Sequence, residues 1–255
     1  MVKNISQSFG YDEKEARRMI KNNLQNHCRN VLEFIKYPQL NRENIANFLS
    51  FEDLEFLDKE LAKGKGVILV TSHFGAKQLL QVGLGLRGYK LNQIYYHMSH
   101  NELTFIQKNV SQKQRQKIEE KIPAKFIPVN GFLRSAYNCL KKNEILVIAA
   151  DGIGLPEHMD KGYAPFSFLG KRVLFPSNIL SLAKRTGASV VPIFVIREGI
   201  RHKIVIEPAI EVKSKSIEDA FKEFVKILER YVLKYPFLWE FWEEFEEGNL
   251  IASDK

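Results

Sequence analysis

Apolar residues recur at helical spacing through the first third of the chain. Steps of three or four residues place one set of them on a single helix face, and this set consists of Ala16, Ile20, Leu24, Cys28, Val31 and Ile35. Pro38 ends this helix. We predict a second helix from Ser50, whose hydroxyl would cap it, because Asp53 follows three residues later as in a capping box.

The pattern changes at Val67, where short apolar runs begin to alternate with helical stretches. The predicted strands are 67–72, 91–97, 125–129, 144–151 and 189–196, and the predicted helices lie near 76–88, 101–120, 131–142 and 176–186. Nearly continuous apolar strands separated by helices indicate a mostly parallel sheet covered on both faces. A last β segment, 202–212, precedes a helix with a capping signal at Ser216 and Asp219.

No internal repeat, low-complexity tract or linker-like segment divides the chain, so we predict a single domain over 1–255. It consists of an N-terminal helical part (1–63) and an α/β core with C-terminal helices (64–255). The predicted fold class is α/β, with a mostly parallel central sheet, helices on both faces and an N-terminal helical segment. The composition of 255 residues, 45% of them hydrophobic and 27% charged, suits a domain with a sizeable core.

The length of the apolar runs, the cysteines and the net charge indicate the cellular compartment and the kind of partner. No apolar run approaches the roughly 18 residues that would span a bilayer, and the first residues lack the apolar middle of a signal peptide. Cys28 and Cys139 lie far apart without metal-ligand spacing, which favours a reduced, cytosolic setting. The net charge of +8 favours anionic partners such as acidic carrier proteins, phospholipid head groups or nucleic acid, and a basic surface with no partner is the alternative. Nucleic acid is not predicted among them, because no motif of a known recognition module accompanies the charge.

Ligands of open α/β sheets bind beyond the carboxyl ends of the strands. Four segments meet this condition: 71–78, 96–100, 151–154 and the loop before Phe175. In the first of them His73 could act as a general base near neutral pH, or it could merely cap a helix or bond within the loop. His97 and His100 have metal-like spacing, but no Cys or carboxylate cluster joins them, so we predict neither a metal nor a cofactor.

The residues around His73 resemble a known family. The stretch "GKGVILVTSHFGAKQLL" is similar to the first motif of the bacterial lipid A biosynthesis acyltransferases, which reads His-x4-Glu or His-x4-Asp. The resemblance continues, in the same order, through "FIPVNGFLRSAYNCLKKNEILVIAADGIG", "APFSFLGKRVLFPSNILSLAKRTGASVVPIFVIR" and the closing "YPFLWEFWEEF". Four motifs over roughly residues 15–245 identify the chain as a member of this family, with its glycerolipid acyltransferase-like fold.

The resemblance implies transfer of a fatty acyl chain from a thioester, on acyl carrier protein or coenzyme A, to a hydroxyl or amine of a lipid. His73 would take the proton of the acceptor. The carboxylate of the family motif would hold the imidazole in the useful tautomer, but this chain has Gln78 at that position. An amide supplies no charge, so either another carboxylate serves or the protein is a catalytically silent member that binds an acyl carrier or lipid.

Asp151 is the predicted substitute for the missing carboxylate, since it ends the strand 144–151 on the same edge of the sheet as His73; a cap or a lysine partner is the alternative. By resemblance, Arg134 would hold a phosphate or stabilise an oxyanion, with a solvated helix face as the alternative. Lys171 and Arg172 precede a helix that we expect Pro176 to begin, where they could meet an anionic substrate or lie on the surface by chance.

Aromatic residues could contact the acyl chain or the membrane. Phe166 and Phe168 could line an acyl channel, although such residues are more often core. Trp239 and Trp242, in the tail 235–245, are expected to pack against the domain rather than sit at a bilayer interface. Taken with the family resemblance, we predict a cytoplasmic protein on the inner face of the cell membrane, attached peripherally through the basic helices near residues 14–36.

Overall fold

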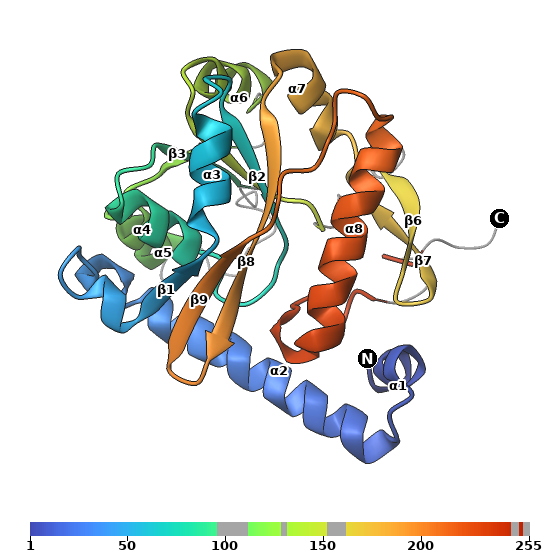
Figure 1. Cartoon of the computed structure of the whole chain (residues 1–255). Helices are drawn as coiled ribbons and strands as arrows, with labels where there is room; N and C mark the ends of the chain where they lie inside the picture. Colours follow the sequence, from blue (N-terminus) through green and yellow to red (C-terminus); the bar gives the residue numbers. More distant parts are fainter. Residues whose placement is uncertain (96–111, 129–131, 152–161, 246–249, 252–255) are drawn as a thin grey trace.

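The computed structural model describes residues 1–95, 112–128, 132–151, 162–245 and 250–251, and its centre is a sheet of seven strands (Figure 1). The strands are β1 (Leu49–Glu52), β2 (Val67–Thr71), β3 (Leu91–Tyr95), β4 (Lys125–Pro128), β5 (Ile145–Ala149), β8 (Ser189–Glu198) and β9 (Arg201–Ile206), in the order β1-β9-β8-β2-β5-β3-β4. All neighbours are parallel except β8 and β9. The mostly parallel sheet is therefore confirmed.

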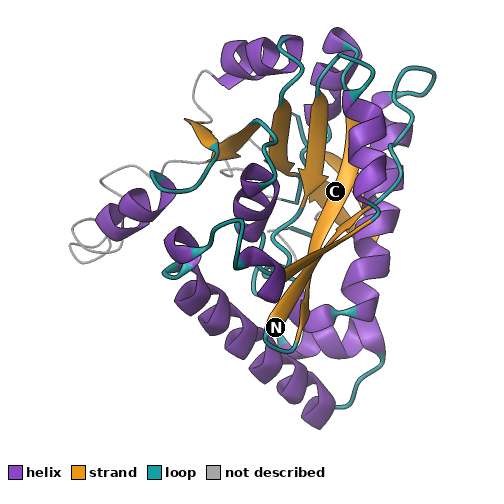
Figure 2. Cartoon of the chain, turned by 60° about the vertical axis from the view of Figure 1, so that its left-hand side comes forward, coloured by secondary structure: helices purple, strands orange, loops and turns teal. Residues whose placement is uncertain are grey.

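Helices cover both faces of the sheet, as Figure 2 shows. Along the central strand β2, Ile68 and Val70 join one core cluster and Val67 and Leu69 the other, because successive side chains of a strand point to opposite faces. The first cluster contains residues of α6 (Phe132–Lys141), α7 (Ile179–Thr186) and α8 (Ile217–Lys234), and the second contains residues of α3 (Leu54–Leu61) and α4 (Leu79–Leu86). The remaining helix of the core, α5, spans Gln112–Glu119.

A β-hairpin lies where the sequence suggested a loop. β6 (Ala164–Phe168) and β7 (Lys171–Phe175) form a separate antiparallel pair that packs against α8. Leu169 and Gly170 connect them with φ of 50° and 72°, the left-handed pair that matches the twist of a two-residue hairpin. The following helix α7 begins at Ile179, so the prediction that it begins at Pro176 is wrong.

The predicted start of the second helix at Ser50 is also wrong. Ser50 lies in β1, paired with Lys203 of the parallel strand β9, and α3 begins only at Leu54. Asp53 precedes it in a left-handed conformation without a side-chain cap. Pairing with the distant strand β9, which cannot be recognised from the sequence around Ser50, therefore outweighs the capping signal. The part of the chain predicted as helical (1–63) thus adds a strand to the sheet. The capping signal at Ser216 is confirmed, since its hydroxyl accepts a hydrogen bond from the Asp219 amide.

The N-terminal helices α1 (Val2–Phe9) and α2 (Glu13–Phe34) cross the lower end of the molecule in Figure 1. An Asp12–Glu15 capping box begins α2, and the short turns η1 (Tyr37–Gln39) and η2 (Ile45–Asn47) follow it. The helix itself was predicted, but only part of its apolar stripe faces the core, where Ala16 is buried and Ile20 is half-buried. α2 buries Ala16, Met19, Asn23, Asn26 and Asn30. It exposes Leu24, Val31 and Leu32, and Ile35 at its C-cap is also exposed.

The C-terminal segment packs against the domain, as predicted. It begins with the short helix η6 (Pro236–Leu238), and Trp239, Trp242 and Phe245 that follow are fully buried. None of the helices in the described part of the chain has both the length and the apolar character needed to cross a bilayer.

Candidate active site

Two adjacent parallel strands bring His73 and Asp151 together. β2 and β5 are paired in register, with Thr71 opposite Ala149, so the residues two positions beyond these lie at the same height past the carboxyl edge. His73 Nδ1 is 2.9 Å from Asp151 Oδ1. Both residues therefore lie at the same carboxyl edge of the sheet, as predicted, and their side chains are in direct contact. We call them the His73–Asp151 pair.

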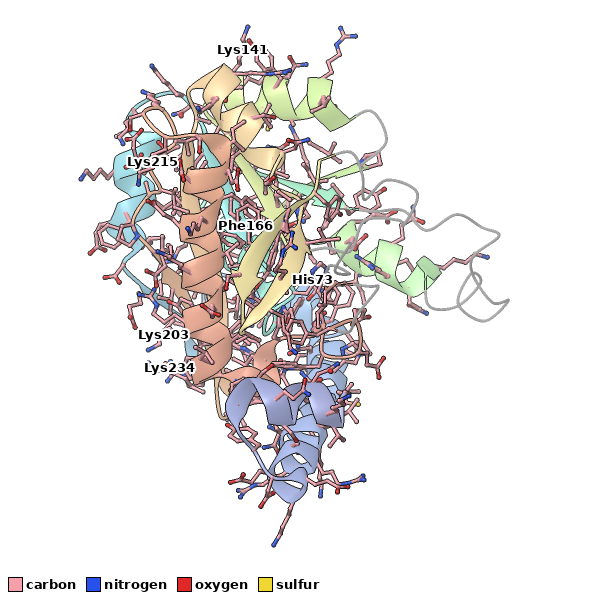
Figure 3. The ribbon with its side chains drawn as sticks, turned by 90° about the vertical axis from the view of Figure 1, so that its right-hand side faces the viewer. His73, Lys141, Phe166, Lys203, Lys215 and Lys234 are labelled. Atoms are coloured by element: carbon pink, nitrogen blue, oxygen red, sulfur yellow. The ribbon has the colours of Figure 1, made fainter. Side chains whose placement is uncertain are left out.

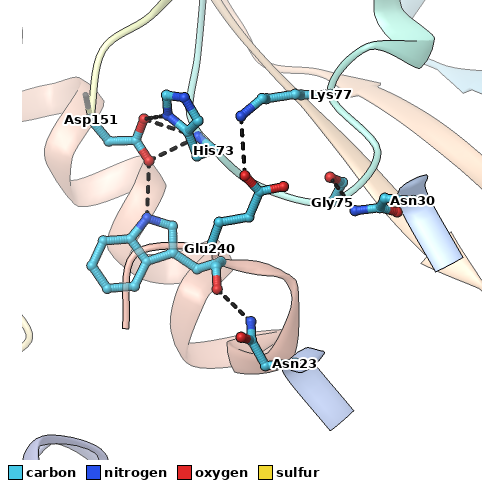
Figure 4. Close-up of polar contacts among 8 residues, drawn as sticks. Asn23, Asn30, His73, Gly75, Lys77, Asp151 and Glu240 are labelled. Carbon is cyan, nitrogen blue, oxygen red and sulfur yellow. Dashed lines mark hydrogen bonds and ion pairs between the residues drawn. The ribbon is translucent and has the colours of Figure 1, made fainter. Parts of the chain in front are cut away.

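The Asp151 carboxylate is held by hydrogen bonds on both oxygens. The backbone N–H of His73 lies 2.9 Å from Oδ1 and 2.8 Å from Oδ2, and Trp239 Nε1 donates to Oδ2 at 3.0 Å (Figure 4). The side chain is only 1% exposed. Burial alone would raise the pKa of Asp151, but the neighbouring His73 and the hydrogen bonds from His73 and Trp239 outweigh it and lower this pKa below its usual value. The group is therefore a buried carboxylate anion at neutral pH.

The His73 ring is oriented by this contact. Asp151 carries no proton to donate, so Nδ1–H is the donor, and in the neutral ring the other nitrogen, Nε2, has the free lone pair. The Phe241 ring packs on the imidazole with centroids 4.4 Å apart, and the His73 side chain remains 27% exposed. No described residue forms a hydrogen bond with Nε2. A histidine held in this way by a buried carboxylate has the geometry that general-base catalysis requires.

Gln78 does not take the place of the family carboxylate. It precedes the first residue of α4, and its side chain makes no hydrogen bond with any described residue, whereas Asp151 from the neighbouring strand is bonded to the His73 ring. Beside Gln78, Lys77 Nζ forms an ion pair with Glu240 Oε2 at 3.1 Å.

Gly75 explains how the chain turns so sharply after His73. Its φ of +60° is left-handed, and a Cβ there would lie 2.0 Å from the carbonyl oxygen of Val195. Only glycine fits both conditions. The loop after β2 is thus pressed directly onto β8, which fixes where the His73 backbone lies.

The predicted basic substrate contacts form no hydrogen bond or ion pair with the His73–Asp151 pair. Arg134 is exposed in the first turn of α6, and it makes no hydrogen bond or ion pair with another described residue. Lys171 and Arg172 lie on β7 of the hairpin rather than before a helix. Lys171 Nζ reaches Gln7 Oε1 of α1 at 3.4 Å, and Arg172 is exposed. Their roles stay predictions.

Phe166 and Phe168 lie on β6 of the hairpin and their side chains are buried in the core; Phe166 is labelled in Figure 3. Phe168 packs edge-on against Trp239 with centroids 5.3 Å apart, so a single ring separates it from Asp151. A role of these rings in an acyl channel stays a prediction. The segment 96–100, including His97 and His100, and the residues 152–154 lie outside the described residues.

Sequence reasoning missed the contribution of the C-terminal segment and of α2 to this site. Trp239 reaches Asp151, and the Glu240 amide donates to the His73 carbonyl at 2.8 Å. Asn30 Nδ2 of α2 donates to the Gly75 carbonyl at 3.0 Å. The only signals in the sequence were the aromatic tail and the asparagines at positions 23, 26 and 30, whose spacing places them on one helix face.

Comparison with known proteins gives the family. Residues 1–242 match the family model described as bacterial lipid A biosynthesis acyltransferase. No curated protein matches the chain. Among solved structures, the crystal structure of the 1-acyl-sn-glycerophosphate acyltransferase PlsC from Thermotoga maritima is similar, with a TM-score of 0.41 and 17% identity over 91% of this chain and 86% of that chain. Since the family model covers nearly the whole sequence, the chain belongs to the bacterial lipid A biosynthesis acyltransferase family.

Proposed function

We propose that this acyltransferase moves a fatty acyl chain from the thioester of acyl carrier protein or coenzyme A to a hydroxyl or amine of a lipid, with His73 as general base and Asp151 as its orienting carboxylate. The contact of 2.9 Å between His73 Nδ1 and Asp151 Oδ1 carries the proposal. It supplies the negative charge that Gln78 cannot, and so favours an active enzyme over a silent binding protein.

The chemistry needs no covalent enzyme intermediate. Nε2 of His73 removes the proton of the acceptor hydroxyl as its oxygen attacks the thioester carbonyl. The tetrahedral intermediate collapses with cleavage of the C–S bond, and the departing thiolate takes the proton back from the imidazolium. Asp151 stabilises the imidazolium between these steps, because a buried anion interacts strongly with a charge that forms beside it.

The anionic parts of the donor would meet basic side chains. Acyl carrier protein is acidic and coenzyme A carries phosphates, and the net charge of +8 suits both. Arg134, Lys171 and Arg172 are the candidates for these contacts, since an arginine can bind a phosphate through two parallel hydrogen bonds.

Incubation of the purified protein with labelled acyl carrier protein and acyl coenzyme A thioesters, and with a panel of lipid acceptors, tests the function. We expect product from at least one pairing and none from His73→Ala, measured as labelled lipid. Transfer that survives the loss of His73 would exclude the general base. A wild-type protein that binds acyl carrier but never transfers the chain, and gains transfer with Gln78→Glu, would establish the silent alternative.

Peripheral attachment to the inner face of the cell membrane is part of the proposal, and α2 supports it. Beside its exposed apolar residues, the helix exposes Lys14, Arg18, Lys21 and Arg29, and Lys36 is exposed just beyond its end. Apolar side chains flanked by basic ones are typical of helices that lie in the surface of an anionic bilayer, where each basic residue contributes about 1 kcal/mol.

We expect Leu32→Asp to weaken binding to vesicles of mixed anionic and zwitterionic phospholipid about tenfold, because burying a leucine is worth roughly 1.5–3 kcal/mol. Leu133→Asp on α6 is the matched control, since Leu32 is 63% and Leu133 is 61% exposed. Co-sedimentation with vesicles measures both. Equal losses in the two variants, or no loss in Leu32→Asp, would contradict contact through α2.

A further inference from the structure

The C-terminal segment pairs with the loop that carries His73. Phe74 and Trp239 form an antiparallel bridge. On one side of it the Glu240 amide donates to the His73 carbonyl, and on the other the Gly75 amide donates to the Leu238 carbonyl, both at 2.8 Å. Residues separated by more than 160 positions in sequence therefore form one short ladder, and the backbone of His73 is fixed by the C-terminal segment.

The Trp239 indole continues this ladder to the carboxylate. Its Nε1 donates to Asp151 Oδ2 at 3.0 Å, while its ring is packed edge-on by Phe168, Trp242 and Phe245, with centroids 4.9 to 5.7 Å away. The residue is fully buried. An indole enclosed in this way is a rigid donor, because the surrounding rings leave it no room to change rotamer.

Two asparagines of α2 hold the outer side of the same ladder. Asn23 Nδ2 donates to the Phe237 carbonyl at 3.0 Å and to the Trp239 carbonyl at 2.6 Å, and Asn30 Nδ2 donates to the Gly75 carbonyl at 3.0 Å. Figure 4 shows both asparagines around the loop. Since buried amides of this kind are costly to leave unpaired, the backbone positions on both sides of the bridge are well determined.

We propose that Trp239 is a positioning residue for the reaction: its indole N–H fixes the Asp151 carboxylate in the orientation that holds the His73 ring. Trp239 does not touch the reacting atoms and acts through Asp151. The inference rests on the proposed function for its kinetic readout, and the experiments below include a spectroscopic readout that requires no substrate.

Trp239→Phe tests the proposal, because it keeps an aromatic ring in the cluster and removes the donor. We expect kcat to fall about tenfold with KM unchanged, by analogy with the roughly 10–100-fold losses that follow removal of the hydrogen-bond partner of a metal-bound histidine. We also expect the acid limb of the pH profile of kcat/KM to move to higher pH. With one donor fewer, the carboxylate interacts more strongly with the His73 imidazolium, so His73 keeps its proton to higher pH.

Trp242→Phe is the matched control. Trp242 is equally buried in the same aromatic cluster and also donates an indole hydrogen bond, but to the Pro236 carbonyl at 2.8 Å. The two substitutions remove the same atoms and should lower Tm by similar amounts. The protein has only two tryptophans, so the fluorescence of the remaining one reports on the fold in each variant. kcat and the pH profile should change in Trp239→Phe alone.

The low-field proton resonance of His73 Nδ1–H gives the substrate-free readout, and we expect it to shift in Trp239→Phe and not in Trp242→Phe. If Trp239→Phe fails to fold, benzothienylalanine can be incorporated at position 239 of Trp242→Phe, where Trp239 is the sole tryptophan. This replaces only the N–H by sulfur, and the same shift is expected.

An unchanged resonance in a folded protein, or equal kinetic changes in both tryptophan variants, would overturn the positioning role. Absence of transfer by the wild type would instead count against the proposed function, and the resonance would still decide the role of Trp239.

Discussion

Asp151→Asn should lower kcat for acyl transfer about 10⁴-fold, the loss seen when the aspartate of a catalytic triad is replaced by its amide. The amide carries no charge to stabilise the imidazolium. Its NH₂ group can also face Nδ1 and so select the tautomer with the proton on Nε2, which cannot accept a proton from the substrate. Steady-state rates with the thioester that gives the fastest transfer measure the effect.

Gln78→Ala is the control for this prediction. Gln78 occupies the family's carboxylate position but makes no side-chain hydrogen bond with a described residue. We therefore expect its removal to change kcat by no more than about threefold, because substitutions that break no hydrogen-bond network have small effects. A large loss in Gln78→Ala with near-normal rates in Asp151→Asn would reverse the assignment of the carboxylate.

The position of the His73–Asp151 pair could be predicted because it depends on regular structure. Strands 67–72 and 144–151 are continuous apolar runs, and parallel strands bring their carboxyl ends to one edge of the sheet. What the sequence left open was that β2 and β5 are neighbours, with Thr71 opposite Ala149. Strand order is set by the packing of the whole sheet. A strand inserted between β2 and β5 would have separated the two side chains.

The features that the sequence did not reveal depend on contacts between distant segments. Trp239 reaches Asp151 across 88 positions, and Asn23 binds the C-terminal segment across more than 210. The α2 helix shows the limit of periodicity most clearly. Its apolar stripe predicted the helix, but its buried face also carries three asparagines. Their side chains bond to the buried backbone carbonyls of Trp239 and Gly75 and to the Arg197 side chain.

Glu33→Ala should lower the free energy of unfolding by about 3–5 kcal/mol, because it leaves a buried arginine without its counter-ion. Arg197, whose side chain is 5% exposed, forms two hydrogen bonds with the Glu33 carboxylate at 2.6 and 2.9 Å. His202, fully buried, binds the same carboxylate at 2.9 Å. Chemical denaturation at pH 7 measures the loss, which corresponds to a fall in Tm on the order of 10 °C.

The matched control is Glu13→Ala, on the same helix and also paired with an arginine, Arg17 at 2.7 Å. That pair is exposed, and exposed i,i+4 pairs contribute only about 0.3–0.5 kcal/mol. Similar losses in the two variants would show that burial of Arg197 does not govern the stability of this contact.

The same carboxylate predicts an acid dependence with a definite sign. Burial would raise the pKa of Glu33, but hydrogen bonds and charge from His202 and Arg197 lower it to about 2. Because the folded value lies below the unfolded one of about 4.3, the stabilisation by Glu33 is complete above that pH and is lost as pH falls towards 2. Denaturation between pH 5 and 2 should therefore show a decline that is smaller in Glu33→Gln, and an equal decline in both proteins would assign the acid sensitivity to other groups.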